Sequence, residues 1–157
     1  MSVKQAPLLS TDLQIQSRFL GESAWVVAPR GSIDSSTSEE FKKFLDEIFQ
    51  KNKSMPHLLL DMADVKYISS MGLGALIPLL KKSKENGSAL ALYDTQLAVT
   101  RVLEISKLDF LLARPDNLPD SHPFSEYVRS QEPERQKRRE VAAEKERLKK
   151  EAEKKKK

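Results

Sequence analysis

One short passage in the middle of this chain constrains the fold more than any other. It begins with a continuous apolar run, His57 to Met62, which is typical of a strand that is covered on both faces. A polar turn then delivers Ser69 and Ser70 at the start of a glycine-containing apolar segment, which predicts a helix from about Met71 to Glu85. A buried strand that leads directly into a helix is the signature of an α/β fold.

The residues before this passage predict a hairpin and a first helix. Apolar and polar residues alternate over 13–19, which indicates a half-buried strand, and 24–28 form a second strand after the short turn at 21–23, so the two strands pair antiparallel. Thr37 and Glu40 form a capping-box pattern. The apolar residues that follow have helical spacing: Phe41, Phe44, Leu45, Ile48 and Phe49.

The residues after the passage predict one more strand and one more helix. Asn86 and Gly87 end the second helix, 89–93 read as a strand, and Asp94 or Thr95 caps a third helix. The expected order is therefore β-β-α-β-α-β-α. Strands that alternate with helices pair in parallel through right-handed crossovers, so we predict a small mixed β-sheet with helices packed on one side.

Charge and proline content divide the chain. We expect an N-terminal extension over 1–10, a single domain over 11–117, a Pro-rich linker over 118–133 and a basic charged tail over 134–157. The chain holds 27 basic residues (Lys and Arg) and 23 acidic residues (Asp and Glu). Residues 131–157 contain 12 of the basic and 7 of the acidic residues. The rest of the chain therefore has 15 basic and 16 acidic residues and is nearly neutral. The tail is expected to be helical or disordered, with Glu to Lys pairs along it.

Composition excludes several functions. The absence of cysteine rules out disulfides, thiol catalysis and thiolate metal sites, and it agrees with a cytoplasmic location. His57 and His122 lack the spacing of a zinc site, and no phosphate-binding loop or nucleophile elbow is present. A metal-dependent enzyme hypothesis would rest on Asp61 and Asp64. However, an aspartate in or near a turn more often makes hydrogen bonds to the nearby backbone than it binds a metal. We expect no cofactor, no metal and no enzyme activity.

The two serines have two readings in terms of physical chemistry. The first backbone N–H groups of a helix lack intrahelical partners and carry the positive end of the helix dipole. A serine hydroxyl at that position caps the helix, and a phosphate there is stabilised as well. Phosphorylation would add about −1.5 to −2 charges without disrupting the helix.

Several segments together resemble the STAS domain, with the anti-sigma-factor antagonists of bacterial partner-switching systems as the most similar branch. The resemblance covers roughly residues 11 to 113 and rests on these segments: Gly31-Ser32-Ile33-Asp34, Phe41, Phe44-Leu45, Leu59-Leu60-Asp61, Val65, Tyr67 to Leu76, and Gly87 before Leu90-Ala91-Leu92. The resemblance implies a binding protein in which phosphorylation of one serine at the start of the second helix reverses the binding of an anti-sigma factor that is also a serine kinase.

The family pattern at this serine is Asp-Ser-Ser/Thr-Gly-Leu/Val-Gly. Aligned on the glycines, the acceptor position falls on Ser70, with Ser69 in place of the aspartate and Met71 in place of the second hydroxyl residue. Ser69 is the alternative acceptor. Asp34 matches an acidic residue that the family presents near the same surface. The resemblance thus implies a partner-binding surface made of Asp34, Ser69, Ser70, Met71, Gly72 and Leu73.

The sequence leads to two hypotheses about function. In the first, the protein is an anti-sigma-factor antagonist whose partners are an anti-sigma factor or serine kinase and a cognate phosphatase. In the second, it is a scaffold subunit of a signalling or membrane-associated assembly, with the serine acting only as a cap. No segment is apolar enough to span a membrane, and the tail predicts weak contact with anionic surfaces but no specific recognition of nucleic acid.

Overall fold

The computed structural model describes residues 3–5, 13–52, 55–109 and 112–156. Its element order is β1 (Val3–Gln5), β2 (Leu13–Gly21), β3 (Ala24–Ile33), α1 (Ser38–Gln50), β4 (His57–Asp61), β5 (Val65–Ile68), α2 (Ser70–Glu85), β6 (Leu90–Tyr93), α3 (Leu97–Ile105), the 3₁₀ turn η1 (Pro115–Asn117) and α4 (Pro123–Lys155).

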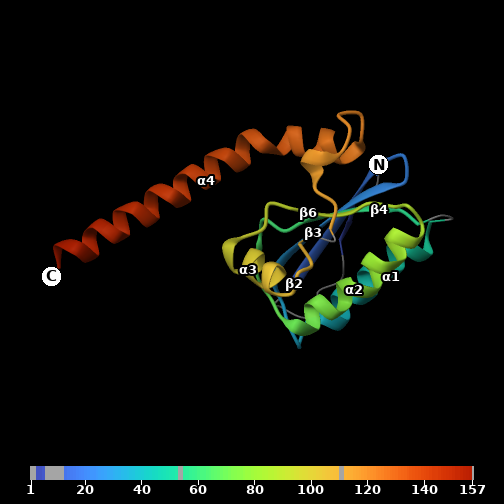
Figure 1. Ribbon diagram of the computed structural model, residues 1–157, viewed down its shortest axis with the longest axis horizontal. Helices are drawn as coiled ribbons and strands as arrows, with labels where there is room; N and C mark the ends of the chain where they lie inside the picture. The colour runs from blue at the N-terminus through green and yellow to red at the C-terminus, as the bar shows by residue number, and fades with distance from the viewer. Residues whose placement is uncertain (1–2, 6–12, 53–54, 110–111, 157) are drawn as a thin grey trace.

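The six described strands form one mixed sheet. Strands β1, β2 and β3 pair antiparallel, which confirms the predicted hairpin, while β4 and β5 both pair in parallel with β3, and β6 pairs in parallel with β4. The long strand β3 makes this possible because its first half lies beside β4 and its second half beside β5. All the helix-connected strands thus point their carboxyl ends toward the same edge of the sheet (Figure 1).

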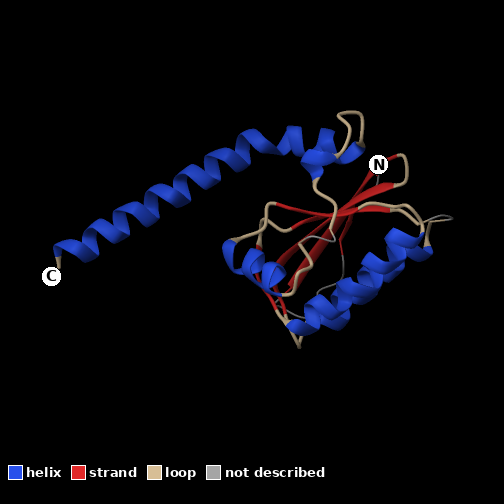
Figure 2. Cartoon of the chain, in the orientation of Figure 1, coloured by secondary structure: helices blue, strands red, loops and turns tan. Residues whose placement is uncertain are grey.

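The main core lies between the sheet and helices α1, α2 and α3. Val27, Leu58 and Leu60 point into this core together with the apolar faces of the three helices, so the predicted sheet with helices on one side is confirmed (Figure 2). The continuous apolar strand is covered on its other face as well. Leu59 belongs to a second buried cluster with Phe124 and Tyr127 of α4.

Helix α4 crosses the boundary that we expected between linker and tail. It begins at Pro123, inside the stretch 118–133, and continues through 134 to Lys155. Its first turns pack on the sheet, whereas the rest extends away from the domain as a single exposed helix (Figure 1). The first turns are fixed because they bury aromatic side chains, which a charge-based division of the chain overlooks.

Two helix starts differ from the expectation. The capping box at Thr37 does not form, because its hydroxyl donates to the carbonyl of Ser32 at 2.8 Å and accepts from the backbone N–H of Asp34 at 2.9 Å. Helix α3 starts after Gln96 rather than at Asp94 or Thr95. Asp94 has a positive φ of 59° and bonds to arginines of α4, so it is not available as a cap.

Candidate functional site

The predicted site residues lie at the carboxyl ends of two paired strands. Ile33 is opposite Ile68 in the parallel pairing of β3 and β5, and the backbone N–H of Ser69 donates to the carbonyl of Ile33 at 2.8 Å. Asp34 and Ser69, which directly follow the paired residues, are therefore neighbours. We call the surface formed by Asp34 and residues 69–73 the serine corner.

Ser69, and not Ser70, caps helix α2. The Ser69 hydroxyl accepts a hydrogen bond from the backbone N–H of Gly72 at 3.3 Å. The Ser69 backbone carbonyl accepts one from the backbone N–H of Leu73 at 2.9 Å. Ser70 is the first helical residue and is exposed, and its hydroxyl makes no hydrogen bond with any residue that the structure describes. The structure thus gives the capping role to Ser69 and leaves the adjacent Ser70 side chain exposed.

The first turn of α2 also leaves backbone donors available. Within the described part of the chain, the N–H groups of Ser70 and Met71 have no acceptor, as expected for the first residues of a helix. These donors, together with the helix dipole, favour negative charge at this point. A phosphate on the Ser70 hydroxyl would lie at a position that tolerates its charge without disrupting the helix.

Gly72 holds this helix end against the sheet. A Cβ at this position would lie 2.7 Å from the Ile68 side chain and 2.8 Å from both the side chain and the carbonyl of Ile33. No side chain fits there without a shift of the backbone. By contrast, a Cβ at Gly74 would meet no atom within 4 Å, so packing within this chain does not require glycine there.

Asp34 is held by its own loop. Its carboxylate accepts from the backbone N–H of Ser36 at 2.9 Å and from the Ser36 hydroxyl at 2.8 Å. These hydrogen bonds from Ser36, with a smaller contribution from Thr37, hold the pKa of Asp34 below its usual value. Asp34 therefore carries a negative charge at neutral pH, next to the start of α2.

The accessible part of the corner is largely uncharged. Met71 and Tyr67 are 55% and 47% exposed, and the outer face of α2 continues with Gly74 and Ile77, the latter 50% exposed. Leu73, which the sequence assigned to the partner surface, is only 6% exposed and belongs to the core. Its side chain supports the corner from beneath. Tyr67 and Ile77 are exposed residues that the predicted partner-binding surface did not include.

A polar hollow lies beside the corner. It has a volume of about 840 Å³ and is lined by residues from β2, β3, β5 and the loops that follow β3, β4 and β6: Gln14, Arg30, Gly31, Ser32, Asp34, Asp64, Lys66 and Gln96. Asp34 belongs to both the corner and the hollow. The carboxyl edge of the sheet therefore combines an uncharged helix end with a charged depression.

The buried carboxylate at the end of β4 binds helix α4. Arg135 makes two hydrogen bonds to Asp61, at 2.6 and 2.9 Å, and a third to Asp94 at 2.9 Å, while the Tyr127 hydroxyl donates to Asp61 at 2.6 Å. We call these four residues the arginine clasp. The pKa of Tyr127 lies above its usual value because the side chain is buried and bonds to Asp61.

The clasp continues outward along α4. Arg138 donates to Asp64 at 2.9 Å, and Arg139 donates to Asp94 at 2.9 Å. Burial alone would raise the pKa of Asp94, but hydrogen bonds from Arg135 and Arg139 outweigh it and hold the pKa below its usual value. Asp61 and Asp64, the pair considered for metal binding, thus both accept from arginines of α4, and no metal-binding cluster occurs among the described residues.

The two histidines contribute to packing around the start of α4. His57 accepts from the backbone N–H of Ala89 at 2.9 Å, and His122 accepts from that of Phe124 at 3.1 Å. Their rings lie 5.3 Å apart. Burial, together with the proximity of His57, lowers the pKa of His122.

Comparison with known proteins identifies the fold and its family. The STAS domain model matches residues 14–122, and the chain therefore belongs to the STAS domain family. A Thermotoga neapolitana protein inferred to be an anti-sigma factor antagonist is 29% identical over 64% of this chain and 88% of its own length. The anti-sigma F factor antagonist of Paenibacillus polymyxa is 27% identical over 59% of this chain and 78% of its own.

Solved structures agree with this assignment of the fold. The anti-sigma factor antagonist SpoIIAA in its unphosphorylated form superposes with a TM-score of 0.56 at 13% identity, over 64% of this chain and 86% of that one. The phosphorylated form of SpoIIAA from Bacillus gives a TM-score of 0.52 at 12% identity, over 64% of this chain and 89% of that one. The family match ends at residue 122, so α4 lies outside it. Within the described residues, no helix has both the length and the apolar character needed to cross a membrane.

Proposed function

We propose that this protein is an anti-sigma-factor antagonist that binds an anti-sigma serine kinase through the serine corner and is released when Ser70 is phosphorylated. The observation that carries the proposal is the division of roles at the corner. Ser69 caps the helix, so the exposed Ser70 hydroxyl is available for modification. The relatives named as anti-sigma factor antagonists support the same role.

The proposed release is electrostatic and steric. A phosphate on Ser70 adds about −1.5 to −2 charges beside Met71, on a surface whose other residues, apart from Asp34, are uncharged. A partner that covers this surface would have to bury that charge, which is costly without a compensating cation. Asp34 already supplies one negative charge nearby, so a second one adds repulsion against any acidic group of the partner.

The fold accommodates the modification without unfolding. The Ser69 cap and the close packing of Gly72 do not involve the Ser70 side chain. Helix α2 is therefore expected to keep its position in the phosphorylated protein. On this proposal the domain is a regulatory binding protein, with no catalytic step of its own.

Mass spectrometry tests the phosphorylation directly. The protein is incubated with ATP and a lysate of its own organism, alongside Ser70→Ala and Ser69→Ala variants. We expect stoichiometric phosphate on Ser70 in the wild type and in Ser69→Ala, and none at this site in Ser70→Ala. Absence of phosphate from both serines, with an active kinase present, would contradict the proposal.

Binding to the isolated kinase provides the second test. Ser70→Ala should bind with an affinity close to that of the wild type, whereas Ser70→Asp should bind more weakly because it places a permanent charge at the corner. Equal affinities for the two variants would refute the switch. That result would favour the scaffold hypothesis, in which the protein associates constitutively and α4 contributes to the assembly.

A further inference from the structure

The exposed part of helix α4 is charged on all sides, but its charges are not evenly distributed. With 3.6 residues per turn, one face roughly 120° wide carries only basic, aliphatic and alanine side chains. This face consists of Arg138, Val141, Ala142, Lys145, Leu148, Lys149, Ala152 and Lys156. We call it the basic face.

The glutamates of the same stretch lie elsewhere on the helix. The five acidic residues between 140 and 153 all fall outside the basic face: Glu140, Glu144, Glu146, Glu151 and Glu153. Two of them, Glu144 and Glu151, pair with Arg147 on the far side of the helix. The segregation concentrates positive charge on the basic face, within which Arg138 pairs with Asp64 of the domain.

Two exposed aliphatic side chains lie within the basic face. Val141 is 55% and Leu148 51% exposed, and a seven-residue separation places them on the same side of a helix. A hollow of about 400 Å³ lies around Val141 and is lined also by Glu134, Lys137, Arg138, Ala142 and Lys145. Aliphatic side chains among mostly basic ones suit an amphipathic protein segment better than they suit a phosphate backbone.

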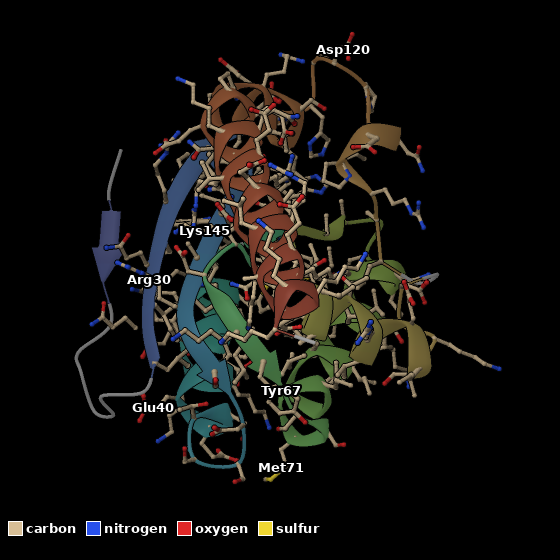
Figure 3. The ribbon with its side chains drawn as sticks, turned by 90° about the vertical axis from the view of Figure 1, so that its left-hand side faces the viewer. Arg30, Glu40, Tyr67, Met71, Asp120 and Lys145 are labelled. Atoms are coloured by element: carbon tan, nitrogen blue, oxygen red, sulfur yellow. The ribbon has the colours of Figure 1, made fainter. Side chains whose placement is uncertain are left out.

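The basic face continues into the carboxyl edge of the sheet. Arg138 lines the hollow on α4 and also donates to Asp64, which lines the polar hollow beside the serine corner, at 2.9 Å. Arg30 lies 3.8 Å from the same Asp64 carboxylate. Figure 3 looks onto this side of the molecule, with Lys145 and Arg30 above Tyr67 and Met71.

We propose that the basic face is a second docking surface, and that its occupant is an acidic amphipathic helix of the protein that binds the serine corner. The identity of that protein rests on the proposed function, whereas the preference for an acidic helix rests on the charges and aliphatic side chains of α4 alone.

The test uses a synthetic helical peptide with leucine at the first and fourth positions of each heptad and glutamate at most others. Its binding to the full-length protein is measured by fluorescence anisotropy at low and high salt. Lys145→Glu/Lys149→Glu reverses two charges on the basic face. Lys150→Glu/Lys154→Glu reverses two charges with the same spacing on the opposite side, and circular dichroism verifies that both variants keep α4 helical.

We expect the wild type to bind the peptide more weakly at high salt than at low salt. Lys145→Glu/Lys149→Glu should lose about tenfold or more in affinity for the peptide, while the control Lys150→Glu/Lys154→Glu should stay within about twofold of the wild type. Leu148→Gln should also weaken binding. Equal losses in both double variants would overturn the proposal, since only net charge would then matter. Absence of peptide binding, or tighter binding of vesicles with 30% phosphatidylserine or of duplex DNA, would overturn it too.

Ser70→Asp separates this proposal from the previous one. It is expected to leave peptide binding unchanged, because the peptide contacts α4 and not the corner. If Ser70 is not phosphorylated, or its variants bind the kinase equally, but the peptide still binds, the switch is refuted and the preference for an acidic helix stands. If Ser70 acts as proposed but the peptide does not bind, only the basic face is refuted as a docking surface.

Discussion

Replacing Arg135 by methionine should destabilise the protein strongly, because it removes the partner of a buried charge. Arg135 and Asp61 are 9% and 4% exposed, and they share two short hydrogen bonds. Breaking one side of a buried ion pair costs about 3–5 kcal/mol. Asp61 would retain the hydrogen bond from Tyr127, so we expect a loss near the lower limit, about 3 kcal/mol.

Urea unfolding measures this loss. Trp25 is the only tryptophan, and it lies in β3, so its fluorescence reports on the sheet, while far-UV circular dichroism reports on the helices. Arg147→Met is the matched control, because Arg147 is an exposed arginine of the same helix. Cleavage by trypsin after Lys137 should also become faster in Arg135→Met if α4 leaves the sheet.

A second substitution distinguishes the buried charge from simple loss of packing. Asp61→Asn in the Arg135→Met background removes the unpaired charge, so the double variant should be more stable than Arg135→Met alone. Our reasoning would be refuted if Arg135→Met stayed within about 1 kcal/mol of the wild type. It would also be refuted if the double variant were no more stable than the single one.

Three further predictions concern the corner and the clasp. Gly72→Ala should lower the free energy of unfolding by about 1–3 kcal/mol through overpacking. Gly74→Ala should instead raise the free energy of unfolding by about 0.5–1 kcal/mol in the isolated protein. Urea unfolding of both variants checks this contrast. Ser69→Ala should lose about 1 kcal/mol by the same assay through loss of the cap. The raised pKa of Tyr127 means that its contribution to stability is present below pH 10, the usual pKa. It is lost as pH rises above this value, because the unfolded chain then releases the proton that the buried hydroxyl keeps for its bond to Asp61. Thermal unfolding from pH 8 to 11 should therefore show a smaller decline in Tyr127→Phe.

The sequence predicted the elements whose patterns are local. The alternation over 13–19 and the continuous apolar run at 57–62 specify how much of each strand is buried, and the structure confirms both. The serine turn was located correctly because a capping serine and a following apolar helix are adjacent in the chain. Which serine caps the helix was not predictable, since Ser69 and Ser70 are both compatible with the position and only the geometry of the turn decides.

The sequence could not show how α4 completes the fold. The continuous apolar strand already required cover on both faces, but the covering residues, Phe124 and Tyr127, lie more than 60 positions away in a stretch marked by proline and charge. Their spacing of three residues is the one local signal of a packed helix face. Arg135 gave no signal at all, because its burial depends on the distant carboxylates Asp61 and Asp94.

The position of α4 limits where a partner can bind. One face of the sheet is covered by α1, α2 and α3, and the start of α4 covers the other face. Ala113, which follows α3 in the chain, forms a parallel bridge with Ala91 of β6. The carboxyl edge of the parallel strands stays accessible, and it contains both the serine corner and the polar hollow.

This arrangement separates two effects of substitution along one helix. Changes in the docked part of α4, such as those in the arginine clasp, should alter stability with little direct effect on a partner at the corner. Changes beyond residue 140 touch no buried side chain, so they should leave stability unaltered and act only on molecules that contact the exposed helix. A stability loss from Lys145→Glu/Lys149→Glu comparable to that of Arg135→Met would contradict this separation, because it would mean that the exposed part of α4 is also held by the domain.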